Sequence, residues 1–200
     1  MNETSLSLLD RARGDVTDEA WQQMTEVYSA LLRSWLTRFD VASTDADDLV
    51  QEVLLTLSRE LRHFEHSGRT GAFRNWLRRI LVNRLRDFWR SRKYRPAAIG
   101  GSTWAEQLER LADESSDVSR EWNLEHDRYV MARLLESLRP RFEPKTWEAF
   151  HRQMFGGQRA DSVAAELGMP LNSVYVARSR VLTALRREAA GLIDEQSDLA

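Results

Sequence analysis

The stretch that decides the fold is 64-FEHSGRTGAFRNWLRRILVNRLRDFWRSRKYR-95. Ten Arg or Lys residues stand against two acids, Glu65 and Asp87, which gives it a net charge of +8 in a chain whose total is −2. Aromatic residues that could contact a base or a core are interleaved with that charge, among them Phe64, Phe73, Trp76 and Trp89. Basic charge mixed with aromatic rings is typical of segments that bind single-stranded nucleic acid.

The composition of residues 65–71, EHSGRTG, predicts a loop, and the following residues to about Lys93 predict a helix capped by Thr70. The apolar residues of this helix recur at helical spacing and predict a buried face: Phe73, Trp76, Leu77, Ile80, Leu81, Leu85 and Phe88. The other side is a basic stripe with two amides, bordered by an indole: Asn75, Arg79, Asn83, Arg86, Trp89, Arg90 and Lys93. An ordinary solvated face is the alternative, and the scarcity of acids makes it the weaker one.

Two helices are expected before this segment. Residues 17–39 carry an aromatic stripe at helical spacing, which predicts core. A second helix begins with Thr44 as N-cap and Asp47 three residues later, a capping-box arrangement. Opposite its apolar stripe the helix presents Asp48, Gln51, Glu52 and Leu55. Taken alone, this face is more often solvated surface than a binding site.

The chain separates its charges into blocks. Residues 1–52 have a net charge of −7 and residues 102–128 one of −5, with the basic stretch between them. Pro96 and the Gly100-Gly101 pair mark the end of the basic segment. Residues 96–127 are therefore predicted to be an acidic linker between two domains.

A helix-turn-helix pattern lies near the C-terminus. Gly168-Met169-Pro170 predicts a tight turn between a short apolar helix and a long helix that starts near Asn172 or Ser173. From Gly168 to Arg187 there are four Arg and no acid, as expected of a helix that enters the major groove. Helix pairs with Gly turns also occur in bundles that do not bind DNA.

Composition excludes several classes of protein. The chain has no cysteine, so a disulfide framework and a cysteine-based zinc site are ruled out. The N-terminus, MNETSLSLLDRARGD, is not expected to be a signal peptide, and no apolar run approaches the length of a membrane span. A cytoplasmic protein that needs no membrane, metal or other cofactor is the expectation. A metal-dependent enzyme would have to use His63, Glu65 and His66, a loop cluster that is more often solvated.

Two blocks carry a family resemblance: DADDLVQEV at 45–53 and FRNWLRRILVN at 73–83. Together with the helix-turn-helix, they resemble bacterial RNA polymerase sigma factors of the extracytoplasmic-function type, over about residues 17–190. The resemblance implies an all-α fold with two small helical domains. Region 2 would span 1–95, the linker 96–127 and region 4 128–192, followed by a tail at 193–200.

The resemblance also implies roles for individual residues. The clamp helices of the largest polymerase subunit would be bound by Asp48, Gln51, Glu52 and Leu55, which reverses the preference for a solvated face. Recognition and melting of the −10 promoter element would fall to Phe64, Ser67, Arg69, Arg79, Asn83, Arg86, Trp89, Arg90 and Lys93. Reading of the −35 element would fall to Ser173, Tyr175, Val176, Ser179, Arg180 and Arg187. Many family members have basic or hydroxylated residues where this chain has Tyr175, Val176 and Ala177.

The expected partners follow from the same resemblance. They are core RNA polymerase, through its clamp helices and flap region, and promoter DNA. Members of the family are often held inactive by an anti-sigma protein, so such a partner is also considered. A free-standing helix-turn-helix repressor or activator remains the alternative, but it leaves the charged blocks of residues 45–95 without a role.

Overall fold

The computed structural model describes residues 7–14, 18–65, 71–91 and 103–193. Regular structure in these residues is helical, apart from one β-bridge between Ala190 and Ile193, and the predicted all-α class is confirmed. The α-helices are α1 (Leu8–Arg13), α2 (Asp18–Arg38), α3 (Ser43–Glu60), α4 (Ala72–Ser91), α5 (Thr103–Ala112), α6 (Asp117–Leu138), α7 (Pro144–Met154), α8 (Ala160–Leu167) and α9 (Leu171–Ala189). Two 3-10 turns, η1 (Leu61–His63) and η2 (Arg139–Arg141), follow α3 and α6.

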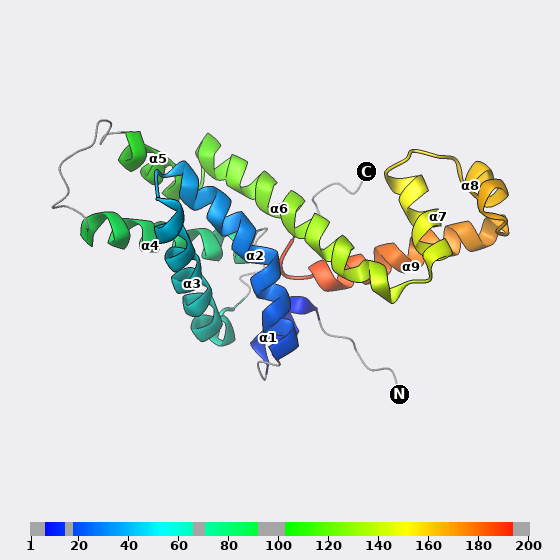
Figure 1. Ribbon diagram of the computed structural model, residues 1–200, viewed down its shortest axis with the longest axis horizontal. Coiled ribbons are helices and arrows are strands. Elements are labelled where there is room, and N and C mark those ends of the chain that lie inside the picture. The colour runs from blue at the N-terminus through cyan, green and yellow to red at the C-terminus, as the bar shows by residue number, and fades with distance from the viewer. Residues whose placement is uncertain (1–6, 15–17, 66–70, 92–102, 194–200) are drawn as a thin grey trace.

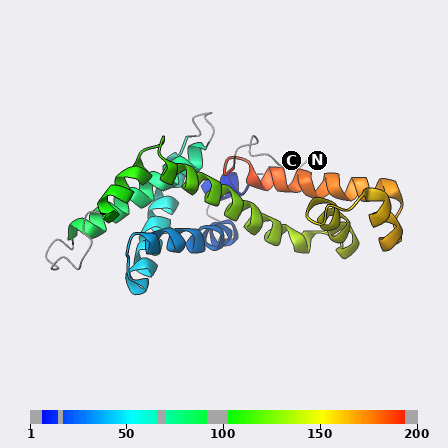
Figure 2. The same ribbon diagram turned by 90° about the horizontal axis from the view of Figure 1, so that it is seen from above.

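The helices are arranged as a bundle, a long connecting helix and a helix-turn-helix unit. Within the bundle α2 packs on α3, α3 on α4 and α4 on α5, and α6 closes the set by packing on both α5 and α2. Figure 1 shows α6 running from this bundle towards α7, α8 and α9. The last helix, α9, returns beside α6 to the bundle, as the second view confirms (Figure 2).

The main hydrophobic core joins α1 to α6 with the C-terminal end of α9. The aromatic stripe of α2 lies inside it as predicted, with Tyr28 at 0% and Trp35 at 1% exposure. Trp35 meets Trp122 of α6 edge to face, with ring centroids 5.2 Å apart, a favourable geometry for two buried rings. A second, smaller core lies within the helix-turn-helix unit.

The start of α3 differs from the prediction. The helix begins at Ser43, its N-cap is Ala42, and no side chain caps its first turn, so the predicted capping box at Thr44 is wrong. Ala42 has the extended backbone of an N-cap, and its carbonyl accepts the N–H of Ala46 at 2.8 Å. A backbone that already turns at Ala42 places Thr44 inside the helix, where its hydroxyl has no end group to cap.

The end of α9 is tied to the bundle by a buried carboxylate. Glu188 has no exposed surface and accepts hydrogen bonds from Arg11 of α1 at 2.9 Å and from Arg141 of η2 at 2.7 Å. Burial by itself raises the pKa of Glu188, but the two guanidinium groups outweigh it and hold the pKa below its ordinary value. Gly191 at φ +81 then lets the chain turn close to Leu9.

Candidate polymerase and nucleic-acid surfaces

The acidic face of α3, made of Asp48, Gln51, Glu52 and Leu55, is open to solvent. Its members are three or four residues apart, so they share one side of the helix, while the opposite side is buried in the main core. Leu55 is 50% exposed, which is unusual for a leucine beside two carboxylates. Within the described ranges neither Asp48 nor Glu52 forms an ion pair, so both charges are available to a partner.

The basic face of α4 is the second surface. Its buried residues include the predicted apolar ones, such as Phe73, Leu77 and Leu85 at 1% exposure or less, and also Arg78, which was not predicted to be buried. On the opposite side Arg79 is 73% exposed, Arg86 is 39% exposed, and Asn83 is exposed between them. Helical periodicity therefore positions these three side chains on one stripe that faces away from the core.

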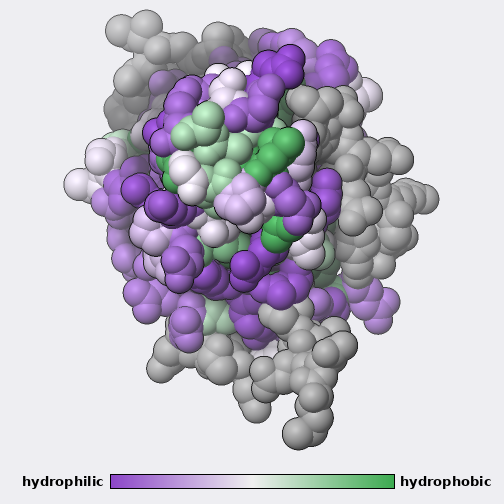
Figure 3. All heavy atoms as spheres, turned by 90° about the vertical axis from the view of Figure 1, so that its right-hand side faces the viewer, coloured by the Kyte–Doolittle hydropathy of each residue, from purple (hydrophilic) through white to green (hydrophobic). Residues whose placement is uncertain are grey.

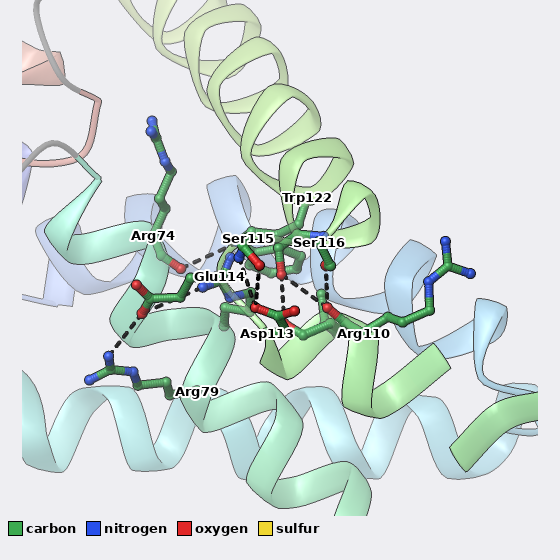
Figure 4. Close-up of polar contacts among 11 residues, drawn as sticks. Arg74, Arg79, Arg110, Asp113, Glu114, Ser115, Ser116 and Trp122 are labelled. Carbon is green, nitrogen blue, oxygen red and sulfur yellow. Dashed lines mark hydrogen bonds and ion pairs between the residues drawn. The ribbon is translucent and has the colours of Figure 1, made fainter. Parts of the chain in front are cut away.

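Acidic residues of α5, of the α5–α6 turn and of α6 pair with arginines of α4, two of which lie on this stripe. Arg79 pairs with Glu114 at 2.9 Å and Arg86 pairs with Glu109 at 3.0 Å. At the start of α4, Arg74 pairs with Asp127 at 2.5 Å. Figure 4 shows Glu114, in the turn that joins α5 to α6, with its side chain directed towards Arg79 of α4. Sequence reasoning did not single out these three carboxylates, although the opposite net charges of residues 64–95 and 102–128 were the signal for them.

Arg78 is buried beneath the same turn. It is 1% exposed, and its nearest described carboxylate, that of Glu114, is 3.7 Å away. Within the described part of the chain, neither terminal nitrogen of its guanidinium has a hydrogen-bond partner. Burial lowers the pKa of Arg78, and the charge of Glu114 only partly offsets this effect.

A cavity of ≈ 400 Å³ lies between η1, the first two turns of α4 and the α5–α6 turn. It is lined by His63, Phe64, Glu65, Ala72, Asn75, Trp76, Arg79 and Glu114. Phe64 is only 7% exposed and stacks on Trp76 with ring centroids 4.8 Å apart. The Oδ1 atom of Asn75 is buried without a hydrogen-bond partner among the described residues, so the lining offers both an aromatic pair and an unused acceptor.

The remaining residues predicted for the −10 element are more scattered. Ser67, Arg69 and Lys93 lie outside the described residues. Trp89 is half-buried and packs edge to face on Phe88 at 5.1 Å. Arg90 is 71% exposed and lies 3.4 Å from Asp87 one turn earlier. The described part of the stripe is therefore continuous from Arg79 to Arg90, with Trp89 at its edge.

The helix-turn-helix predicted near the C-terminus is present as α8 and α9. Gly168 ends α8 in the left-handed conformation at φ 60, and the N–H of Met169 bonds to the carbonyl of Ala164 at 2.9 Å. Pro170 is the N-cap of α9, which starts at Leu171, one residue before the predicted start. Gly168 and Pro170 thus form the turn between the two helices that the sequence predicted.

The outer face of α9 is apolar in its first turns and basic further along. Tyr175 is 53% and Val176 45% exposed, while Ser173 is half-buried. Figure 3 shows this end of the molecule, where apolar residues gather inside a hydrophilic rim. Ser179, Arg180 and Arg187 line a hollow of ≈ 400 Å³ against η2. Such a face offers apolar contacts near its start and cationic contacts along its length.

The described residues contain neither a candidate metal site nor a helix that could span a membrane. No group of three His, Asp or Glu residues that could hold a metal ion is found in the described part of the chain. No helix of the described ranges combines the length and the apolar character that crossing a bilayer requires.

Comparison with known proteins identifies the family. The family model for Sigma-70 region 2 matches residues 24–95, which include most of α2 and all of α3 and α4. RNA polymerase sigma factor NccH of Alcaligenes xylosoxydans xylosoxydans is 30% identical over 177 residues, or 87% of this chain and 89% of the relative. RNA polymerase sigma factor CnrH of Cupriavidus metallidurans is 26% identical over 179 residues, or 90% and 89% of the two chains. With its all-α fold and these relatives along almost its whole length, the chain belongs to the RNA polymerase sigma factors of the extracytoplasmic-function type.

Proposed function

We propose that the chain binds core RNA polymerase through the acidic face of α3 and directs promoter-specific initiation with two DNA-reading surfaces. In this proposal residues 1–95 act as region 2 and melt the −10 element, and residues 128–192 act as region 4 and read the −35 element. Residues 96–127 connect the two, and 193–200 form a tail. The observation that carries the proposal is the charge pattern: open carboxylates on α3 lie next to a basic stripe on α4.

The open face of α3 supports the polymerase contact. A protein surface that combines an exposed leucine with unpaired carboxylates suits a basic or amphipathic helical partner. The clamp helices of the largest subunit are the partner proposed for Asp48, Gln51, Glu52 and Leu55. Region 4 would contact the flap region of the same enzyme, and an anti-sigma protein would compete for these surfaces. A subunit of RNA polymerase works in the cytoplasm, and we infer that location for the chain.

The cavity at the start of α4 supports capture of an unstacked base. Flipping a base out of a duplex costs a few kcal/mol, which stacking and hydrogen bonds in a pocket can offset. Trp76 supplies the exposed part of the aromatic pair, while Phe64 supports it from beneath. Asn75, one of the two amides of the predicted stripe, adds an acceptor to the contacts proposed for Ser67 and Arg69. Asn83, Arg86, Trp89, Arg90 and Lys93 would then hold the displaced strand.

The outer face of α9 supports reading of a duplex −35 element. Tyr175 and Val176 present apolar surface that can contact thymine methyl groups, and Arg180 can reach a base edge or a phosphate. Ser173, Ser179 and Arg187 extend the contact along the helix. We therefore expect thymine-containing steps in the −35 sequence at the position that faces Val176.

Run-off transcription tests the proposal. Purified chain and core polymerase are incubated with a library of genomic promoter fragments from the host, with core polymerase alone as the control. We expect transcripts whose templates share two short sequence blocks at a constant spacing. The proposal fails if no template gives a transcript that depends on the added chain.

A further inference from the structure

We infer that three carboxylates, from α5, the α5–α6 turn and α6, form an intramolecular clasp that pairs with arginines of α4, including two on its DNA-facing side, in the free protein. This acidic clasp consists of Glu109, Glu114 and Asp127. The inference rests on the proposed function, because it takes the basic face of α4 to be the surface for the displaced strand. It adds that Arg79 and Arg86 stay paired with carboxylates until α5 and the α5–α6 turn move away.

The clasp contacts α4 at three points, and two of them lie on the basic stripe. Glu114 pairs with Arg79 at 2.9 Å and Glu109 with Arg86 at 3.0 Å, while Asp127 anchors α6 to the largely buried Arg74 at 2.5 Å. Arg79 and Arg86 are about 10 Å apart along the helix axis at the usual rise per residue. Carboxylates therefore pair with two cations of the stripe, where the phosphates of a bound strand would otherwise lie.

Apolar packing holds the clasp in place. Leu108 and Leu111 of α5 are 2% and 0% exposed and belong to the main core. On α6 the indole N–H of Trp122 donates a hydrogen bond to the backbone carbonyl of Arg74 at 3.3 Å. The hydroxyl of buried Ser119 donates to the backbone carbonyl of Leu111 at 2.8 Å. Exposed ion pairs contribute little by themselves, so the apolar residues keep the carboxylates in position.

Arg78 shows that the closed arrangement has a cost. Its buried guanidinium lies 3.7 Å from Glu114 and has two terminal nitrogens without hydrogen-bond partners among the described residues. A buried charge with unused donors is unfavourable unless it is fully paired. Movement of the turn that carries Glu114 would let Arg78 reach water or a phosphate, so opening recovers part of the free energy that it costs.

The same turn also borders the candidate base cavity. Glu114 and Arg79 are both lining residues of that cavity, together with Asn75 and Trp76. One displacement of the turn therefore exposes the basic stripe and enlarges the entrance of the cavity. Because of this coupling, we expect the free chain to bind single-stranded DNA poorly, although it carries both the basic stripe and the cavity.

Binding of a fluorescein-labelled (dT)20 oligonucleotide to the full chain tests the clasp. The test variant is Glu109→Gln/Glu114→Gln, and the control is Glu26→Gln/Glu136→Gln, which removes the same charge from exposed sites on α2 and α6. We expect about tenfold tighter binding for the test variant, which corresponds to two surface ion pairs released. The control should change the affinity by less than about twofold, since it leaves the stripe covered.

The salt dependence gives a second readout. Two Arg side chains that become free to bind phosphates should steepen the slope of log K against log salt by about 1.4. Glu109→Gln alone, which touches only the exposed Arg86, should steepen it by about 0.7 without affecting buried Arg78. Equal affinities and slopes for the test and control variants would overturn the clasp. If the wild-type chain still supports run-off transcription in that case, only the clasp is wrong and the proposed function stands.

Discussion

The acidic face of α3 and the basic face of α4 lie on neighbouring helices of one bundle, yet they differ in how accessible they are. The carboxylates Asp48 and Glu52 are exposed and have no ion pair among the described residues. The cations Arg79 and Arg86 remain 73% and 39% exposed, but they are paired with Glu114 and Glu109. The free chain therefore offers its proposed polymerase surface at once and its proposed DNA surface only after a rearrangement.

The difference has a simple electrostatic origin. The described residues of the acidic segment, 103–128, fold against α4 of the basic segment, since opposite charges favour that docking and Leu108, Leu111 and Trp122 fix it by burial. Among the described residues nothing basic covers the outer face of α3 in the same way. We expect a sigma factor with this arrangement to bind polymerase before it binds single-stranded DNA.

Charge reversal on α3 should have the largest effect. Asp48→Arg/Glu52→Arg places two cations against the proposed basic partner, and like charges at an interface cost several kcal/mol, so affinity for core polymerase should fall at least about 100-fold. Fluorescence anisotropy with labelled chain measures the dissociation constant. Glu60→Arg, on the same helix but off this face, serves as the control and should bind nearly as wild type. Normal binding by the double variant would show that α3 is not the polymerase surface.

Asp127→Asn tests how firmly the basic face is closed. The change leaves Arg74 and buried His126 without their carboxylate, so the free energy of unfolding should drop by about 2–3 kcal/mol at pH 7. Urea denaturation followed by circular dichroism measures it. Glu136→Gln, which removes an exposed pair with Arg133, should change stability by less than about 0.5 kcal/mol.

The stability difference between the wild type and Asp127→Asn should depend on pH. Burial raises the pKa of Asp127, but its hydrogen bond with His126 and the charges of His126 and Arg74 hold the pKa below the ordinary value. A carboxylate with a lowered pKa stabilises the fold fully above its unfolded pKa of about 3.9, and this contribution is lost as the pH falls through the folded value. Wild type and Asp127→Asn should therefore converge in stability in strong acid. A gap that stays constant from pH 7 downwards would contradict this role of Asp127.

Arg79→Ala/Arg86→Ala should have the smallest effect and separates the closed state from the open one. In the free chain both side chains are already paired, so affinity for (dT)20 should change by less than about twofold. In the complex with core polymerase, where the stripe is proposed to be open, affinity for single-stranded promoter DNA should fall roughly tenfold. Equal losses in both states would mean that the stripe is never covered.

Residue patterns predicted α2, α4 and the helix-turn-helix, but α5 and the first half of α6 lie within residues 96–127, which were predicted to be a linker. The aromatic stripe of α2, the apolar side of α4 and the turn at Gly168 and Pro170 were all predicted and are present. The capping box at Thr44 was wrong because the residue pattern does not reveal that the backbone already turns at Ala42. Short motifs at helix ends depend on one or two dihedral angles, whereas a stripe of seven side chains does not.

The sequence by itself determined the family, the all-α class, the separation of charge into blocks and the outward direction of Asn83, Arg79 and Arg86. Tertiary structure alone decided what covers each face. It placed Glu109 and Glu114 on the basic stripe, buried Arg78 beneath their turn and set Phe64 behind Trp76. Helical periodicity specifies which side of a helix is polar, but only packing between segments distant in the sequence specifies which partner that side meets.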